Sequence, residues 1–306
     1  MEYCTGRTEF EIQENSAVTL GKFDGVHAGH RKLMKRILDY KKQGCKAVVF
    51  TFDTPPYSVL GREKAQMLTT NEERRIILER LGIDYLIECP FVPEIISMEP
   101  EEFIKRILVD RLNVKYIVIG TDFRFGHNRR GDAEMLATYA DEYGYQLEVV
   151  EKEVYENDII SSTRIRSVLE NGDMEAASML LNGPYHVMGN VVHGKELGRQ
   201  IGIPTVNLIP DDNKLLPPNG VYFSKTLTEK GTYYGVTNIG VNPTVEHGTI
   251  RKVETNLFDY KGDLYDTWID VELYHWERKE RKFLSVDDLQ TQMFHDILLA
   301  QKYFRR

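Results

Sequence analysis

Residues 21–30 read GKFDGVHAGH and connect an apolar run at residues 17–20 to an amphipathic segment that ends at Gly44. In that segment apolar side chains such as Leu33 and Ile37 recur at helical spacing, which predicts a strand, a glycine-bearing loop and a helix. A helix N-terminus offers unpaired backbone N–H groups to a phosphate, and glycines let the backbone approach it closely. The segment therefore predicts a phosphate site at the first strand–helix junction.

Two histidines lie at the start of this predicted helix. His27 and His30 are three residues apart, so both imidazoles can lie on one side of the first turn. There they can donate hydrogen bonds to a pentavalent phosphorus as charge develops. The alternative is a glycine turn with two incidental histidines. A zinc site is disfavoured, because no third ligand lies nearby in the sequence.

The N-terminal part of the chain alternates short apolar runs with amphipathic segments. Continuous apolar runs such as YIVIG at residues 116–120 are typical of strands buried on both faces. Strands that alternate with helices of this length indicate a parallel sheet with helices on both faces. The predicted strands are residues 17–20, 47–52, 83–87, 115–119 and 146–150, and the predicted helices are residues 30–44, 71–81, 100–112 and 132–143.

The C-terminal part has a different pattern. Its strand-like runs are separated by Gly, Pro and Asn clusters, with no helix before Ser285, which predicts an antiparallel, barrel-like domain and a terminal helix. Ser285 is the expected N-cap of that helix, with Asp288 three residues later. We place the domain junction within LNGPY at residues 181–185, which gives domains of residues 1–183 and 184–306. The predicted strands are residues 187–192, 221–227, 233–239, 253–260 and 268–274.

Composition excludes several classes of protein. The chain has 306 residues, 47 acidic and 39 basic side chains, and a formal net charge of -8, which argues against a nucleic-acid binder that relies on bulk positive charge. No run approaches the ~20 apolar residues that cross a bilayer, and the N-terminus does not resemble a secretory signal. The three cysteines are scattered and read as reduced thiols. We expect a cytoplasmic protein that acts on small molecules, without a nucleic-acid or membrane partner; self-association stays open.

A second phosphate-binding pattern occurs at residues 189–208, GNVVHGKELGRQIGIPTVNL. Its glycines fit neither a dinucleotide fingerprint nor a Walker loop. Backbone amides and a cation there could hold phosphates, while the Thr205 hydroxyl and the Asn207 amide oxygen could ligate Mg²⁺. The base for an attacking hydroxyl would be Glu254, which interrupts the apolar and uncharged polar run VETNLF at residues 253–258. A solvent-facing glutamate at a strand edge is the alternative explanation for Glu254.

The N-terminal motif GxFDGxHxGH resembles the flavin-adenylylating branch of the HxGH nucleotidyltransferase superfamily. Two later segments support the resemblance: GTDFRFG at residues 120–126 resembles the family's flavin-proximal loop, and ISSTRIR at residues 160–166 resembles its ATP-phosphate signature. The resemblance implies a Rossmann-like domain with His27 and His30 as catalytic residues. It implies ATP contacts by Gly21, Phe23, Asp24, Gly29, Ser162, Thr163 and Arg166, and flavin contacts by Asp122, Phe123 and Phe125.

The C-terminal half is similar to riboflavin kinases from about residue 185 onward. The shared motifs are PTVN at 204–207, NIGVNPT at 238–244, the strand with Glu254, and RKERKF at 278–283. Together the halves resemble the bacterial bifunctional riboflavin kinase/FAD synthetase family, which implies a C-terminal flavokinase barrel, Mg²⁺ as cofactor, and ATP, riboflavin, FMN and FAD as substrates or products. In that family Glu254 would activate the riboflavin 5′-hydroxyl, and Thr205 and Asn207 would bind Mg²⁺. The implied ATP contacts are Gly194, Gly198, Arg199 and Asn207, and the implied flavin contacts are Arg278 and Glu280.

The N-terminal half departs from the family pattern at three places. Lys22 stands where Asn is frequent, TFDTPP at residues 51–56 lacks a histidine between its prolines, and LNGPY at 181–185 lacks an arginine. Two alternatives therefore stay open: a riboflavin kinase with a weakened adenylyltransferase half, and a flavin-responsive regulatory protein without turnover. Formation of FAD from FMN and ATP separates the first alternative from a bifunctional enzyme.

Overall fold

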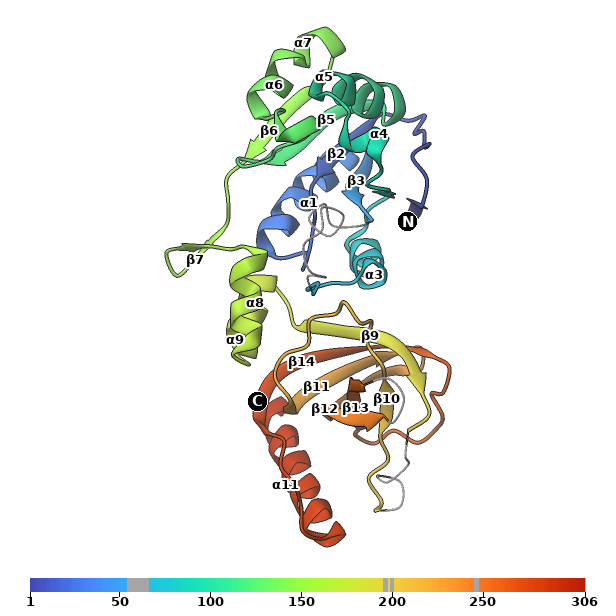
Figure 1. The fold of residues 1–306 in the computed structure, drawn as a ribbon, viewed down its shortest axis with the longest axis vertical. Coiled ribbons are helices and arrows are strands. Elements are labelled where there is room, and N and C mark those ends of the chain that lie inside the picture. Colours follow the sequence, from blue (N-terminus) through green and yellow to red (C-terminus); the bar gives the residue numbers. More distant parts are fainter. Residues whose placement is uncertain (54–65, 195–197, 199–200, 245–247, 306) are drawn as a thin grey trace. The chain divides into compact units, whose positions relative to one another are not determined.

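The computed structural model describes residues 1–53, 66–194, 198, 201–244 and 248–305. The chain forms two compact units, Met1–Ser161 and Ser162–Arg306 (Figure 1). The first unit contains a six-stranded sheet in the order β1-β4-β3-β2-β5-β6, and every adjacent pair is parallel. This confirms the predicted parallel sheet. The strands are β1 Glu2–Thr5, β2 Ser16–Leu20, β3 Lys46–Phe52, β4 Tyr85–Cys89, β5 Val114–Gly120 and β6 Gln146–Val150.

Helices cover both faces of the sheet. On one face, the helices α5 (Pro100–Phe103), η1 (Ile104–Arg111) and α6 (Ala133–Thr138) contribute to a core that includes Phe50 and Ile119 of the strands. On the other face lies α1 (Ala28–Lys41), which contacts β2, β3 and β5. Its apolar stripe is buried as the spacing predicted, and each such side chain contributes roughly 1.5–3 kcal/mol by leaving water. The buried residues of α1 are Leu33, Met34 and Ile37.

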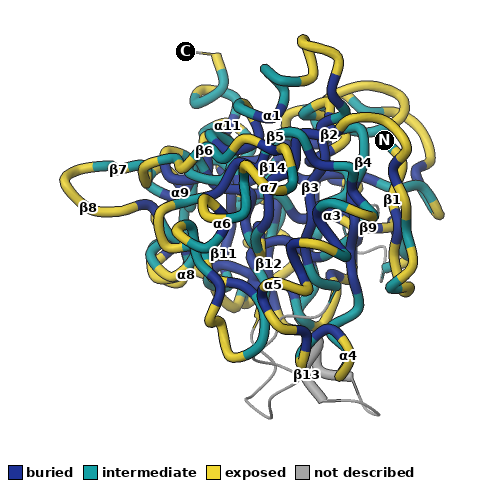
Figure 2. Tube along the Cα trace, turned by 90° about the horizontal axis from the view of Figure 1, so that it is seen from above, coloured by how far each residue is buried: buried dark blue, intermediate teal, exposed yellow. Residues whose placement is uncertain are grey.

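Two predicted helices of this unit are subdivided. The segment predicted at 100–112 begins as α5 and continues as η1, a π-helix, and the segment predicted at 132–143 divides at Tyr139 into α6 and α7 (Ala140–Tyr143). Apolar periodicity does not register such changes of helix type. The unit also contains α3 (Asn71–Leu81), the short α4 (Pro93–Ile96) and η2 (His127–Arg129), and a hairpin of β7 (Val154–Tyr155) and β8 (Asp158–Ile159), largely exposed in Figure 2.

The second unit is a closed antiparallel barrel flanked by helices. The strand order is β10-β13-β12-β11-β14-β9, and the terminal helix α11 (Val286–Phe304) follows the last strand (Figure 1). Ser285 caps α11 as predicted, because its hydroxyl accepts the backbone N–H of Asp288 at 3.1 Å. The strands are β9 Tyr185–Val192, β10 Val206–Leu208, β11 Gly220–Thr228, β12 Gly231–Thr244, β13 Gly248–Leu257 and β14 Trp268–Lys279.

Two helices precede the barrel, α8 (Ser162–Glu170) and α9 (Met174–Leu181), and α9 packs against β9 and β14. The division by contacts therefore falls before α8, whereas the sequence places the junction at residue 183. The assignment of residues 162–183 to the adenylyltransferase domain stays a prediction.

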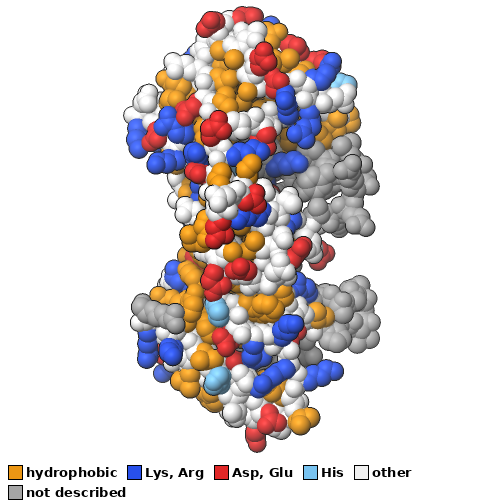
Figure 3. Space-filling model, turned by 90° about the vertical axis from the view of Figure 1, so that its left-hand side faces the viewer, with side chains coloured by type: hydrophobic (Ala, Val, Ile, Leu, Met, Phe, Trp, Pro, Cys, Tyr) orange, Lys and Arg blue, Asp and Glu red, His pale blue; other side chains and the backbone are white. Residues whose placement is uncertain are grey.

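Charged side chains of both signs share the surface in view (Figure 3), and the three cysteines are buried. Figure 3 shows Lys and Arg side chains interspersed with Asp and Glu over the face in view. Cys4, Cys45 and Cys89 are buried free thiols. Within the described part of the chain, no helix is both long enough and apolar enough to cross a membrane.

Candidate active sites

The loops that follow β2 and β5 lie at one edge of the parallel sheet. These strands are neighbours, but the chain continues from β2 to β3 on one side and from β5 to β6 on the other. In open α/β sheets, ligands bind at such a switch point, outside the carboxyl ends of the strands. The loop after β2 contains GKFDGVH at residues 21–27, and the loop after β5 contains TDFRFG at residues 121–126. The fold thus brings the two N-terminal motifs of the first unit to the same edge.

His27 and His30 form a stacked pair at the start of α1. Their ring centroids are 3.6 Å apart and the planes differ by 19°. His27 is the N-cap, and its Nδ1 accepts the backbone N–H of His30 at 3.4 Å. An imidazole nitrogen that accepts must be unprotonated, so this bond leaves the His27 proton on Nε2. Gly29 allows the stack, because a Cβ there would come within 3.3 Å of the His27 ring.

Both imidazoles are held in the neutral form. Burial lowers the pKa of His27 to about 4. Burial, together with the nearby His27, lowers the pKa of His30 well below its usual value. Within the described residues, Nδ1 of His30 is buried without a hydrogen-bond partner. The pair can therefore supply neutral N–H donors at pH 7, rather than two cations.

The Phe23 ring packs against His30, and Gly21 leaves the room that this ring needs. Phe23 is completely buried, and its ring lies edge-to-face with the His30 ring, with 5.2 Å between the centroids. A Cβ on Gly21 would come within 3.0 Å of the Phe23 ring. The carboxylate of Asp24 accepts backbone N–H groups from Leu68 and Thr69. The predicted ATP contacts of Gly21, Phe23, Asp24 and Gly29 stay predictions, and the described contacts of Phe23 and Asp24 are to the protein itself.

The loop after β5 separates its three predicted flavin residues. Asp122 is exposed and pairs with Lys152 at 2.8 Å, and the hydrogen bond from Lys152 lowers the pKa of Asp122. Phe123 is half-buried and stacks on Phe125 with 5.7 Å between the centroids. Phe125 is buried in the core beneath, close against Gly131. Asp122 and Phe123 are therefore the accessible members of the set.

The predicted ATP-phosphate signature opens a helix. Ser162 and Thr163 are the first residues of α8, and Arg166 lies one turn later, half-buried. Hydroxyls and an arginine at a helix N-terminus suit a phosphate. This helix belongs to the second unit, so the role of these residues in adenylyl transfer stays a prediction.

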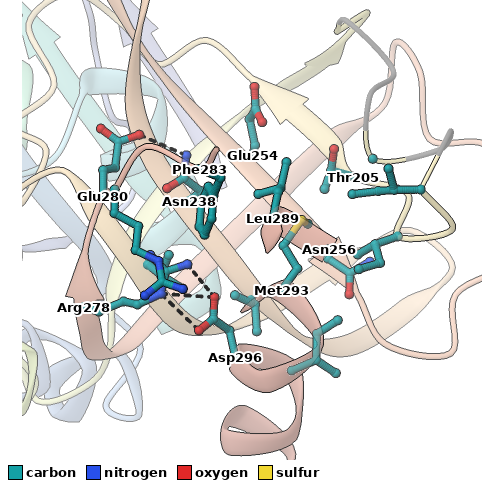
Figure 4. A pocket seen from close by; sticks show the side chains of 17 residues that line it. Thr205, Asn238, Glu254, Asn256, Arg278, Glu280, Phe283, Leu289, Met293 and Asp296 are labelled. Carbon is teal, nitrogen blue, oxygen red and sulfur yellow. Dashed lines mark hydrogen bonds and ion pairs between the residues drawn. The ribbon is translucent and has the colours of Figure 1, made fainter. Parts of the chain in front are cut away.

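The barrel unit contains a cavity of about 280 Å³ beside α11 (Figure 4). Five sequence-predicted residues line it, from four separate parts of the chain: Gly198, Thr205, Glu254, Arg278 and Glu280. Residues that sequence reasoning did not select complete the wall. They are Ile201, Ile203, Val221, Val236, Asn238, Asn256, Arg281, Phe283, Leu289, Met293, Asp296 and Ile297.

Strand register explains how Glu254 reaches this cavity. Glu254 on β13 lies directly opposite Asn238 on β12, and side chains two residues apart on a strand share a face, so Asn256 follows Glu254. Asn256 donates to the backbone oxygen of Pro204 at 2.8 Å and so holds the turn before Thr205. Figure 4 shows Glu254 and Thr205 on the upper part of the cavity wall, away from Arg278 and Asp296.

Asn207 takes a different position from Thr205. It is buried, lies opposite Glu254 in the β10–β13 register, and does not line the cavity within the described residues. Its amide fills the space that a side chain at Gly194 would need, which explains that glycine. Gly198 is required for a similar reason, because a Cβ there would collide with the backbone oxygen of Ile203. The predicted contact of Arg199 lies outside the described residues.

Two family models match the chain, in sequence order. The FAD synthetase model matches residues 9–164, and the riboflavin kinase model matches residues 181–304. Bifunctional riboflavin kinase/FMN adenylyltransferases from Buchnera aphidicola (strain APS), Escherichia coli K12 and Bacillus subtilis 168 are 37%, 36% and 36% identical to it. These matches cover 96%, 95% and 96% of this chain and 95%, 94% and 94% of the relatives. The chain belongs to the bifunctional riboflavin kinase/FMN adenylyltransferase family.

Membership of this family confirms the predicted family, fold class and enzyme class. A crystal structure from Streptococcus pneumoniae, described as a macrolide-efflux protein, covers 98% of both chains at 31% identity with a TM-score of 0.85.

In this member of the family, the predicted flavin residue Arg278 is engaged by a residue that sequence reasoning missed. Its Nε and terminal nitrogen donate to both carboxylate oxygens of Asp296, the closest at 2.6 Å. Gln292 donates to the same carboxylate at 2.6 Å. Asp296 is 2% exposed and lies on α11. In the sequence it is one polar residue in an amphipathic helix, and only the packing of α11 on the barrel distinguishes it.

Glu280 lies at the other side of the same wall. Asn238 donates to its carboxylate at 3.4 Å, and Gly240 leaves the room that the Glu280 side chain fills. Arg278 and Glu280 thus bring a cation and an anion to the lining of the cavity, and Figure 4 shows the apolar side chains Leu289 and Met293 of α11 between Glu254 and Asp296. A planar, partly polar ligand fits a wall of this composition.

Proposed function

We propose that the barrel unit phosphorylates riboflavin to FMN with ATP, and that the sheet unit adenylylates FMN to FAD with release of pyrophosphate. The observation that carries the first activity is the convergence of Glu254, Thr205 and Asn256 on one cavity, which apolar side chains of α11 also line. The second activity is supported by the neutral histidine pair at the switch point of the sheet. ATP, riboflavin and FMN are the substrates, and FAD is the final product.

In the kinase reaction, Glu254 accepts the proton of the riboflavin 5′-hydroxyl while that oxygen attacks the γ-phosphorus of ATP. The bond between the γ-phosphorus and the bridging oxygen of ADP breaks. Arg278 and Glu280 orient the flavin at the rim, and Gly198 leaves the backbone accessible for phosphate contacts. Positioning of this kind supplies most of the rate acceleration in phosphoryl transfer.

Mg²⁺ fits the oxygen-rich part of this wall. Thr205 and Glu254 supply a hydroxyl and a carboxylate, and Mg²⁺ in phosphoryl-transfer sites takes few protein ligands beside waters and phosphate oxygens. Thr205 would hold the ion, which neutralises charge on the ATP phosphates when it is bound. Asn207 lies directly opposite Glu254 in the β10–β13 register, so the two side chains share a face, and its amide oxygen would be a second protein ligand.

In the adenylyltransferase reaction, a phosphate oxygen of FMN attacks the α-phosphorus of ATP, and the bond to the pyrophosphate oxygen breaks. His27 and His30 donate neutral N–H groups to the developing charge, and the N-terminus of α1 contributes its backbone N–H groups. Asp122 and Phe123 contact the flavin from the loop after β5. Ser162, Thr163 and Arg166 bind the ATP phosphates.

One incubation tests both activities. The full chain is mixed with riboflavin, ATP and Mg²⁺, and FMN and FAD are separated by chromatography; a parallel reaction starts from FMN. We expect both products. FMN without FAD in either reaction would favour the kinase-only alternative, and tight riboflavin binding without any product would favour the regulatory protein.

The location and the assembly of the enzyme remain our expectations. We expect it to act in the cytoplasm on small molecules, without a nucleic-acid or membrane partner. Self-association is testable by light scattering of the purified chain, with and without its substrates.

A further inference from the structure

The loop that carries the histidines is held in a strained backbone conformation. Phe23 and Val26 have φ angles of 50° and 41°, and Gly25 between them has 86°. A positive φ is rare for any residue other than glycine and is a marked outlier for a β-branched one such as Val26. Such strain persists only where the surrounding structure over-determines it, so the contacts of this loop should show what holds it.

Three hydrogen bonds tie the loop to a segment more than forty residues later. The Oδ1 atom of Asp24 accepts the backbone N–H groups of Leu68 at 2.8 Å and Thr69 at 3.2 Å. In return, the Thr69 hydroxyl oxygen accepts the backbone N–H of Gly25 at 2.6 Å. We call these three bonds the Asp24–Thr69 clasp. Leu68, Thr69 and Gly25 are buried, and Asp24 is half-buried, so the clasp is largely removed from water.

On the Thr69 side of the clasp, the chain continues into helix α3, which is anchored to the sheet. Thr70 begins α3 with a capping box, in which its hydroxyl accepts the Glu73 N–H and the Glu73 carboxylate accepts the Thr70 N–H. One turn later, Arg74 pairs at 2.6 Å with Glu88, at the end of β4, and both side chains are at most 5% exposed. Buried ion pairs add little net stability, but they can specify a single geometry. The clasp thus links the strained loop to a fixed point of the sheet.

On the Asp24 side of the clasp, the loop continues directly into the two histidines. Asp24 and Gly25 lie between Phe23, whose ring supports His30, and Val26, which precedes the N-cap His27. The backbone oxygen of Val26 accepts a hydrogen bond from Arg31 in the first turns of α1. If the loop relaxed to negative φ values, both the Phe23 ring and the start of α1 would move, and the stacked pair would lose its support.

We propose that Asp24 and Thr69 are positioning residues for adenylyl transfer, and that they act by holding residues 23–26 in the strained conformation that places His27 and His30. This proposal rests on the proposed role of the histidines. The Oδ1 atom of Asp24 accepts two backbone N–H groups, which an amide oxygen at this position could also accept. The role of Asp24 as an ATP contact stays a prediction.

The experiment measures FAD formation from FMN and ATP by the full chain. Asp24→Ala and Thr69→Val should each lower kcat about tenfold or more, as expected for the loss of buried hydrogen bonds. Asp24→Asn and Thr69→Ser keep the accepting oxygens and should recover most of kcat. Riboflavin kinase activity of the same preparations should be unchanged, since the barrel unit carries it, and this activity also reports on the integrity of the chain.

Two further measurements separate positioning from ligand contact. The double variant Asp24→Ala, Thr69→Val should lose less than the product of the two single losses, because both residues hold the same pair of segments. Val26→Gly removes the strain, so Asp24→Ala should cost less kcat in that background than in the wild type. In Asp24→Ala, NMR titration should show the pKa of His27 rising toward that of an exposed histidine.

Specific results would overturn the proposal. If Asp24→Asn is as damaging as Asp24→Ala, the charge itself is needed, and the two hydrogen bonds to backbone N–H groups do not explain the role of Asp24. If the losses of kcat in the Asp24 and Thr69 variants multiply fully in the double variant, the two residues act independently. If Val26→Gly does not reduce the loss of kcat caused by Asp24→Ala, the clasp does not act by holding a strained backbone. Absence of FAD formation by the wild-type chain would instead contradict the proposed function, so the two failures are distinguishable.

Discussion

The histidine loop and the barrel cavity are the two proposed sites of phosphate chemistry, but they are built in different ways. The histidine loop comes from one contiguous stretch, residues 21–30, and uses backbone N–H groups and neutral imidazoles whose protons are already in place. The barrel cavity collects side chains from β12, β13, β14 and α11 and places a carboxylate among them. The chemistry accounts for the difference: a riboflavin hydroxyl must lose a proton to become a nucleophile, whereas the FMN phosphate is already an anion.

The largest effect should come from removing the base of the cavity. Glu254→Gln keeps the size of the side chain but cannot accept the proton, so we expect riboflavin phosphorylation to fall by about 10²–10⁴. FAD formation from supplied FMN should not change. The two rates are measured separately by chromatography. A Glu254→Gln variant that retains a rate near wild type would show that the kinase site, like the histidine loop, works without a base.

The histidine pair should give the next largest effect, and in the opposite reaction. Changing both His27 and His30 to Ala removes two donors and should lower FAD formation by about 10²–10³, the usual consequence of losing hydrogen bonds to developing charge. Riboflavin phosphorylation serves as the internal control and should persist. Unchanged FAD synthesis from FMN in this double variant would contradict the assignment of the sheet unit.

A smaller effect is expected at the wall that joins α11 to the barrel. Asp296→Ala would leave the Arg278 guanidinium without its buried partner, which typically costs several kcal/mol; since Arg278 is about one-fifth exposed, we expect about 2 kcal/mol of barrel stability. The KM for riboflavin should rise, while FAD formation from FMN stays constant. Gln292→Ala removes a neutral donor to the same carboxylate and should cost less. Equal losses in chemical denaturation would argue against a special role for the ion pair.

The same contrast explains what sequence could and could not predict. GKFDGVHAGH predicted its strand, loop and helix correctly, because local spacing and helix capping act within a few residues of one another. The motifs of the second half indicated the barrel and Glu254, but not Asp296. Asp296 lies on α11, and its role depends on the packing of this helix against the barrel, where Arg278 of β14 donates to it. Asp24 shows a different limit. Its motif position indicated a nucleotide contact, which stays a prediction, but gave no sign of its hydrogen bonds to Leu68 and Thr69, because no local pattern identifies that partner segment.

The smallest effect concerns pH, and it follows from the neutral imidazoles. Since burial lowers the pKa of His27 to about 4, FAD formation should change little between pH 8 and 6 on account of this residue. Stability should respond differently. Between about pH 6.5 and 4 the unfolded chain binds a proton at His27 that the folded chain does not, so unfolding becomes easier as pH falls, by up to about 1.4 kcal/mol per pH unit.

The control for this prediction is His27→Gln, which removes the titrating group. Thermal unfolding of the wild type and of the variant should show a smaller loss of stability in the variant on going from pH 6.5 to 4.5. If the loss is the same in both, His27 is not the buried neutral group that the loop geometry requires. The histidine loop would then resemble the barrel cavity, as a site that works through charged side chains. The two sites would differ only in the elements that supply their residues.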